Sequence, residues 1–295
     1  MSGLCRSQVS VAVGEVVTVA AIWSSSFVAV KFLLEYTGPF TVGGLRYFGA
    51  FLLLAPWLAR AGWGRGLSKP LWGRLAVLGV AQYAVGNGAL FAALKVLPAT
   101  SGSLALCLVP VPVLLLGIAW LGERPRPRQL VGLTAAVGGS VLFFGPGLGN
   151  GTAWAIGLLV VALTAFAVFP VVAREVARGG AVGNLVLTGL PLGIGGGLLV
   201  VVGGLVEGVP RLPLSAWGVV LGLAAVNTVV AYLLFNHALR RLAAVEANVV
   251  LNLTPLGTAL LAWAALGERL TGLQVAALCV VVVGVTLVQW RRRGR

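Results

Sequence analysis

Ten apolar runs dominate this sequence, and each has roughly the 17–25 residues that a helix needs to cross a bilayer. Glycine, proline and clusters of basic residues separate the runs. Because lipid leaves backbone groups to be satisfied internally, runs of this length predict membrane-spanning helices and an all-α integral membrane protein. The predicted spans are residues 11–34, 39–59, 71–91, 100–121, 128–144, 152–173, 182–206, 215–237, 245–265 and 271–290.

The charge of the chain agrees with a membrane protein. Only 9% of residues are charged and 59% are hydrophobic, whereas a soluble domain has about 25% charged residues. The net charge of +14 would suit nucleic acid, but the basic residues lie in short clusters between the apolar runs. With the N-terminus inside, 16 of the 21 Lys and Arg residues fall on the cytoplasmic side. The positive-inside rule therefore predicts a multi-pass plasma (inner) membrane protein with both termini cytoplasmic and no nucleic-acid partner.

An internal repeat relates the two halves of the chain at an offset of 145 residues. Leu-Gly-Glu-Arg at 121–124 recurs at 266–269, and Trp, Pro and Gln residues match at the same offset. The repeat predicts two domains, residues 1–147 and 148–295, with five spans in each. Because five is odd, the second half enters the membrane the opposite way round. The predicted fold is thus ten transmembrane helices in two inverted five-helix repeats.

Inverted repeats are typical of transporters, in which two equivalent halves rock to open a shared cavity to either side. We therefore expect alternating access and a small-molecule substrate, with membrane lipid as the other partner. An enzyme is not expected, because the chain has no Asp, one His and no hydrolase or metalloprotease motif. We expect neither a metal nor a cofactor, and the three Cys residues lack ligand spacing. A membrane scaffold without transport activity is the alternative. The sequence does not define the oligomeric state, and a monomer is compatible with it.

Several ordered motifs resemble the drug/metabolite transporter superfamily, and its EamA-type ten-helix members in particular. Trp23-Ser24-Ser25-Ser26-Phe27 is similar to the family's Trp-Gly-x-x-Phe opening, with Ser24 in place of Gly. Arg46-Tyr47-Phe48 is similar to its Arg-Phe pattern, and the fourth and ninth spans carry a proline before the Gly-Glu-Arg loop. The resemblance implies export or exchange of amino acids, aromatic or hydrophobic ones included, or of related metabolites. Export of drugs or other metabolites is the alternative.

Polar residues in the spans mark the predicted cavity, because a polar group facing lipid is costly. Helical spacing puts Tyr83, Asn87 and Phe91 on one face of the third span, and repeat-related stripes run along the fourth, eighth and ninth. The opening motif adds two residues of the first span. The candidate substrate-binding residues are Gln82, Tyr83, Asn87, Asn227, Thr228, Tyr232, Asn236, Asn248, Asn252, Trp23 and Ser24. The alternative is that the amides only bond across helices, and that the opening motif serves close packing.

Prolines and basic residues in the spans have two readings each. Pro110 and Pro255 interrupt the fourth and ninth helices and are predicted hinges, although a static bend explains them equally well. Lys31, Arg46 and Lys95 lie near the outer ends of their spans. We expect them to extend to the headgroups, and attraction of substrate carboxylates towards an outward opening is the alternative.

The acidic residues predict how transport is driven. All seven are Glu, each near a helix end or in a loop, and the single His237 is expected to be hydrogen-bonded and structural. Proton or sodium coupling usually uses a carboxylate inside the membrane. We therefore predict a facilitator or exchanger without a buried carboxylate relay. Glu123 and Glu268 are expected to pair with Arg124, Arg269 or other basic loop residues.

Overall fold

The computed structural model describes residues 2–109, 111–112, 127–144, 153–178, 182–238 and 250–289. Every regular element in these ranges is helical. Within the described residues, five helices are long and apolar enough to cross a membrane: Ser10–Leu33, Pro39–Arg60, Lys69–Leu94, Leu185–Val206 and Leu214–Phe235. Three shorter apolar helices lie in the same ranges: Ala153–Val168, Thr254–Leu266 and Gly272–Leu287. The prediction of an all-α membrane protein is confirmed. Pro110, Glu123 and Asn248 lie outside the described residues.

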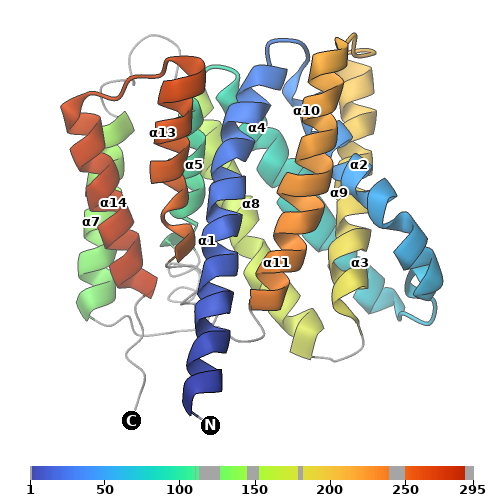
Figure 1. The fold of residues 1–295 in the computed structure, drawn as a ribbon. Coiled ribbons are helices and arrows are strands. Elements are labelled where there is room, and N and C mark those ends of the chain that lie inside the picture. Colours follow the sequence, from blue (N-terminus) through green and yellow to red (C-terminus); the bar gives the residue numbers. More distant parts are fainter. Residues whose placement is uncertain are drawn as a thin grey trace. The chain divides into compact units, whose positions relative to one another are not determined.

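Helices occupy the described parts of all ten predicted spans, and Figure 1 labels most of them. In chain order the elements are α1 (Ser2–Leu33), α2 (Pro39–Arg60), the short η1 (Gly62–Gly64), α3 (Lys69–Gly79), η2 (Val80–Asn87), α4 (Gly88–Leu94), α5 (Ala99–Cys107), α7 (Pro127–Phe144), α8 (Ala153–Arg178), α9 (Asn184–Val206), α10 (Leu214–Ala224), η4 (Ala225–Val230), α11 (Ala231–Ala238), α13 (Thr254–Leu266) and α14 (Gly272–Gln289). The third span is thus α3, η2 and α4 in succession, and the eighth is α10, η4 and α11.

Local sequence explains where several helices begin. Pro39 occupies the first turn of α2, where the backbone N–H that proline lacks would have no partner within the helix. At the start of α14, Gln274 Oε1 accepts from the backbone N–H of Thr271, and Thr271 Oγ1 accepts from the N–H of Gln274. This reciprocal pair is a capping box, which satisfies two N–H groups that the first turn leaves unpaired. The repeated Gln at 274 therefore has a structural role.

The chain forms two compact units, and each takes segments from both halves of the sequence. Unit 1 contains residues 1–28, 98–153 and 230–295, and unit 2 contains residues 29–97 and 154–229. The third span belongs wholly to unit 2, together with α2, α9 and the first part of the eighth span. The compact units and the repeats are therefore different divisions of the same chain.

Glycines allow α2 and α9 to pack backbone to backbone in unit 2. A Cβ at Gly44 would lie 2.7 Å from the backbone nitrogen of Val200, and one at Gly196 would lie 2.5 Å from that of Phe48. Small residues at such contacts let membrane helices approach closely where van der Waals packing holds them together. The polar residues of α2 are therefore carried by a helix that packs closely against α9.

In unit 1, α7 and α14 pack along each other in the same way, and Figure 1 shows the two side by side. A Cβ at Gly284 would lie 2.6 Å from the backbone nitrogen of Ala136, and one at Gly139 would lie 2.8 Å from a methyl of Val281. The described part of the fourth span, α5, packs against α13 of the ninth. Equivalent spans of the two repeats thus meet in this unit.

Both repeats contain a π-helical segment at the same position. At the offset of 145 residues Val80 corresponds to Ala225, and these are the first residues of η2 and η4. In each segment a side chain bonds to a carbonyl five residues earlier: Asn87 Nδ2 donates to the oxygen of Gln82, and Thr228 Oγ1 donates to that of Leu223. Segments of this kind are rare and frequent at functional sites. The sequence did not predict them.

Two glutamates cap helices that are remote in sequence. Glu207, after α9, accepts from the backbone N–H groups of Phe40 at 3.0 Å and Thr41 at 2.8 Å, at the start of α2. Glu268, after α13, likewise accepts from the N–H of Ala99 at 2.7 Å and from Thr100, at the start of α5. The first turn of a helix combines unpaired N–H groups with the positive end of its dipole, so a carboxylate is stabilised there. Among the contacts described for Glu268, these replace the expected pairing with Arg269.

Candidate substrate-binding site

A buried cation lies inside the second span. Arg46 follows Pro39 by seven residues, which places it about 10 Å along α2 from the start of the helix. Only 7% of its surface is exposed. The expectation that Arg46 extends to the headgroups is therefore wrong, because a snorkelling side chain would be solvated at its tip. Lys95 is exposed, while the ammonium of Lys31 donates to the carbonyls of Leu94 and Leu97 at 2.8 Å each.

The π-helical segment of the eighth span holds the guanidinium in place. Arg46 Nε donates to Thr228 Oγ1 at 3.1 Å, and a terminal nitrogen lies 3.4 Å from the carbonyl oxygen of Asn227. The Thr228 hydroxyl gives its own proton to Leu223, so its oxygen is free to accept from the guanidinium. Thr228 is fully buried and Asn227 nearly so. The second and eighth spans are thus joined through one arginine.

A second set of contacts joins the same part of α2 to the third span. The Tyr47 hydroxyl donates to Asn87 Oδ1 at 2.7 Å. The Tyr47 ring lies 5.0 Å from that of Tyr83 and is stacked at 6.2 Å on that of Phe91. The guanidinium of Arg46 lies 5.0 Å from the centre of the Tyr47 ring. The predicted stripe on the third span is thus buried, and all three of its members contact Tyr47.

These contacts form one polar and aromatic cluster within unit 2, which we name the Arg46 cluster: Arg46, Tyr47, Tyr83, Asn87, Phe91, Asn227 and Thr228. It combines a fixed positive charge, hydroxyl and amide groups that donate and accept, and flat apolar rings. Such a combination can bind the polar and the apolar parts of one small molecule. Its hydrogen bonds and ring contacts also join the second, third and eighth spans.

Not every predicted residue of this unit belongs to the cluster to the same degree. Gln82 contributes its backbone carbonyl, which Asn87 binds, while its side chain is half-buried. Arg46 and Tyr47 were absent from the predicted site, although both stood in the motif that carries the family resemblance. A basic residue well inside an apolar span was the signal that would have found Arg46.

Asn252, the described candidate residue of the ninth span, contacts the fourth span in unit 1. Asn252 is buried, its Oδ1 lies 3.5 Å from Cys107 Sγ, and its Nδ2 donates to Thr286 Oγ1 at 3.3 Å. Cys107 and Asn252 are equivalent positions of the repeat. The helix breaks after Leu251, and Pro255 lies in the first turn of the new helix α13, where its missing N–H costs little.

The residues of the opening motif pack against helices of unit 1. Ser24 is buried and its hydroxyl lies 2.7 Å from the carbonyl oxygen of Ala20 and 3.1 Å from that of Thr254. A Cβ at Gly257 would lie 2.5 Å from this hydroxyl, so a glycine there makes room for the serine. Trp23 contacts the rings of Tyr232 and Phe235 at 5.7 and 5.6 Å. Ser24 is thus hydrogen-bonded and closely packed within unit 1, and two aromatic rings lie beside Trp23. Nothing is described of the side chain of Asn236.

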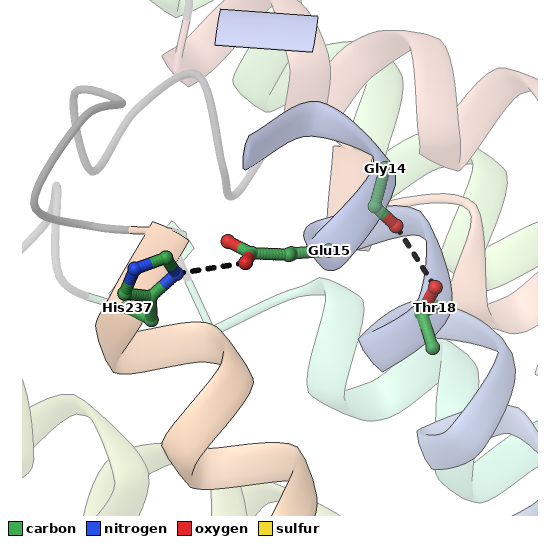
Figure 2. A network of polar contacts seen from close by, with 4 residues as sticks. All are labelled: Gly14, Glu15, Thr18 and His237. Atoms are coloured by element: carbon green, nitrogen blue, oxygen red, sulfur yellow. Dashed lines mark hydrogen bonds and ion pairs between the residues drawn. The ribbon is translucent and has the colours of Figure 1, made fainter. Parts of the chain in front are cut away.

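The single histidine is paired with an acid of the first span. His237 Nδ1 lies 2.7 Å from Glu15 Oε1, and the two side chains are 46% and 16% exposed. Figure 2 shows the two side chains pointing toward each other. In the same turn of α1 the Thr18 hydroxyl donates to the carbonyl of Gly14. The second oxygen of Glu15 is buried and has no hydrogen-bond partner among the described residues. His237 is therefore hydrogen-bonded, as expected, and it connects α11 to α1. No group of three or more potential metal ligands occurs within the described ranges.

Known proteins resemble this chain over nearly its whole length. The model of the EamA-like transporter family matches twice, at residues 12–145 and 153–290. An uncharacterized transporter of Archaeoglobus fulgidus is 29% identical over 84% of this chain and 86% of its own. The uncharacterized inner membrane transporter YedA of Escherichia coli K12 is 25% identical over 90% of this chain and 87% of its own.

A protein of known crystal structure has the same fold, with a TM-score of 0.67, 22% identity, and coverage of 95% of this chain and 97% of that one. The two matches of the family model agree with the internal repeat of this ten-helix family. The apolar spans, the repeat and these relatives lead to one conclusion: the chain is a membrane transporter and belongs to the EamA-like transporter family.

Proposed function

We propose that this protein exports or exchanges amino acids, aromatic or hydrophobic ones included, or related metabolites by alternating access. We place it in the inner membrane with both termini cytoplasmic, and we divide it into inverted repeats of residues 1–147 and 148–295. The Arg46 cluster is the observation that carries the proposal. It buries charged, hydroxyl and amide groups within an apolar bundle, where polar residues are costly and usually mark a substrate pathway.

The repeat supports the mechanism. The contact between Cys107 and Asn252 joins equivalent positions of the fourth and ninth spans, as a pseudo-two-fold axis between the repeats requires. The π-helical segments also begin at equivalent positions, Val80 and Ala225. Symmetry-related irregularities in two halves suit a protein whose halves exchange conformations.

Interrupted helices supply the proposed hinge. The ninth span breaks between Leu251 and Thr254, where the chain makes a turn before α13 begins. Without a continuous ladder of backbone hydrogen bonds, the two parts of the span can change their mutual angle at low cost. We propose Pro255 as the ninth-span hinge and Pro110 as its counterpart in the fourth span.

We propose that transport proceeds without a carboxylate relay, as a facilitator or exchanger. Glu15 is the acid that tests this, because it lies within the apolar part of α1, not at a helix end or in a loop as expected, and pairs with His237. Counterflow should be independent of a proton gradient in both the wild type and Glu15→Gln. A proton-driven counterflow that Glu15→Gln abolishes would refute this part of the proposal.

The experiment is counterflow in proteoliposomes preloaded with unlabelled amino acids, scored by uptake of labelled Phe, Trp, Met, Thr and Leu. We expect saturable uptake by the wild type and its loss in Asn87→Ala and in Asn252→Ala. Thr164→Val is the control. Thr164 is an exposed polar residue within a span, and its hydroxyl donates to the carbonyl of Val160 in the same helix. No uptake by folded protein would remove amino acids as cargo and leave drugs or other metabolites. Unchanged transport in both Asn variants would remove these residues from the site.

A further inference from the structure

We infer that Arg46 binds an anionic group of the cargo, and that the protein therefore selects small molecules carrying a carboxylate over their uncharged amides or esters. This inference rests on the proposed function, because it names the chemistry by which that same site recognises its substrate. It begins from the burial of Arg46, a residue that is only 7% exposed inside an apolar helix.

A guanidinium inside a membrane span needs a reason. An ionised side chain inside a spanning helix is costly, because lipid does not solvate its charge. Charged residues inside spanning helices face the interior of the bundle and usually mark a substrate or ion pathway. Because arginine is always ionised and its planar fork matches a carboxylate, a ligand with a carboxylate suits this position.

The surroundings fix the guanidinium before a ligand arrives. Nε donates to Thr228 Oγ1, whose own proton is donated to Leu223, and the guanidinium carbon lies 5.0 Å from the centre of the Tyr47 ring. Tyr47 is in turn held by Asn87. A cation fixed in this way loses little side-chain freedom when it binds, and such preorganisation increases affinity and selectivity.

The rings beside the charge suit the rest of such a molecule. Tyr47, Tyr83 and Phe91 are all buried, and the rings of Tyr83 and Phe91 both contact that of Tyr47. A cargo with a carboxylate at one end and an apolar or aromatic body would match both parts of the Arg46 cluster. Among amino acids this favours aromatic and large apolar ones, and it also admits arylalkanoates without an amino group.

The test measures binding and transport separately. Purified protein in nanodiscs is titrated with phenylalanine, phenylalaninamide, phenylacetate and phenylacetamide, and the same four compounds compete for uptake of labelled phenylalanine in proteoliposomes. For the wild type we expect each carboxylate to bind at least about tenfold more tightly than its amide. In Arg46→Gln that ratio should fall to about one, and in Arg46→Lys it should be intermediate because the charge stays but the fork is lost.

A matched pair of variants separates recognition from folding. Thr228→Val removes the acceptor that orients Arg46, whereas Thr164→Val makes the same change at an exposed site. We expect the carboxylate-to-amide ratio to decrease in Thr228→Val and to match the wild type in Thr164→Val. Because the readout is a ratio between two ligands on the same protein, a loss of folded protein alone would not change it.

The outcomes are distinguishable. Carboxylate-selective binding that depends on Arg46, without counterflow, would refute the proposed transport of these compounds and uphold the inference. Counterflow with equal affinity for acid and amide, or with selectivity retained in Arg46→Gln, would overturn the inference and leave the proposed function standing. Absence of binding and of transport by folded wild-type protein would overturn both.

Discussion

The carboxylate of Glu207 should stabilise the fold by capping a helix from a distance. Glu207 is half-buried and accepts from two successive N–H groups, those of Phe40 and Thr41, at 3.0 and 2.8 Å. Gly38, directly before α2, has no side-chain cap of its own. A lost cap costs about 0.5–2 kcal/mol, and the attraction between a carboxylate and the helix dipole adds about 0.3–1 kcal/mol. We therefore expect Glu207→Ala to lower the free energy of unfolding by about 2 kcal/mol.

Two further variants sharpen this prediction. Glu207→Gln keeps one acceptor oxygen and loses the charge, so we expect a loss of about 1 kcal/mol. Gly38→Ala should act on the same contact, because a Cβ at Gly38 would overlap the carboxylate of Glu207. Gly38→Ala should therefore be destabilising in the wild type and nearly neutral in the Glu207→Ala background, since the group that it displaces is already gone.

The measurement is equilibrium unfolding in mixed micelles, followed by tryptophan fluorescence. Glu35→Ala is the control, because Glu35 is an exposed acid close to the same end of α2. An effect of Glu207→Ala equal to that of Glu35→Ala within about 0.5 kcal/mol would refute the capping argument. So would full additivity of Gly38→Ala and Glu207→Ala, because independent sites share no contact.

Three further predictions concern the packing and capping of the fold. Glu268→Ala should destabilise by about 1–2 kcal/mol, since it removes the remote cap of α5, and the same unfolding titration measures it. Gly196→Ala should cost about 1–3 kcal/mol, because its Cβ would lie 2.5 Å from the backbone nitrogen of Phe48; stability equal to wild type would show that α2 and α9 are not in close contact. Gly257→Ala should destabilise by a similar amount through its overlap with Ser24, and Ser24→Gly should restore stability in the double variant, which a thermal melt would show or contradict.

The sequence alone determined the spans and the internal repeat. Each span is a local property, because the transfer of apolar side chains into lipid is summed residue by residue along one helix. The stripe of Tyr83, Asn87 and Phe91 was readable for the same reason, since residues four apart share a face of a helix, and all three are buried. These features needed no knowledge of what packs against them.

Only the tertiary structure decided what the polar residues contact. The sequence predicted that Arg46 reaches the headgroups. In the structure Arg46 instead donates to Thr228, which lies 182 positions away along the chain. In the sequence Glu207 and Glu268 are acids near helix ends or in loops. In the structure each accepts from backbone N–H groups that lie 166 to 169 positions away along the chain. The π-helical segments are also decided by the tertiary structure. They leave backbone carbonyls without a regular α-helical partner, and side chains must donate to these, as Arg46 does to Asn227 and Asn87 does to Gln82. A hydrogen bond depends on distance and direction between two atoms, and the position of either atom in the sequence specifies neither.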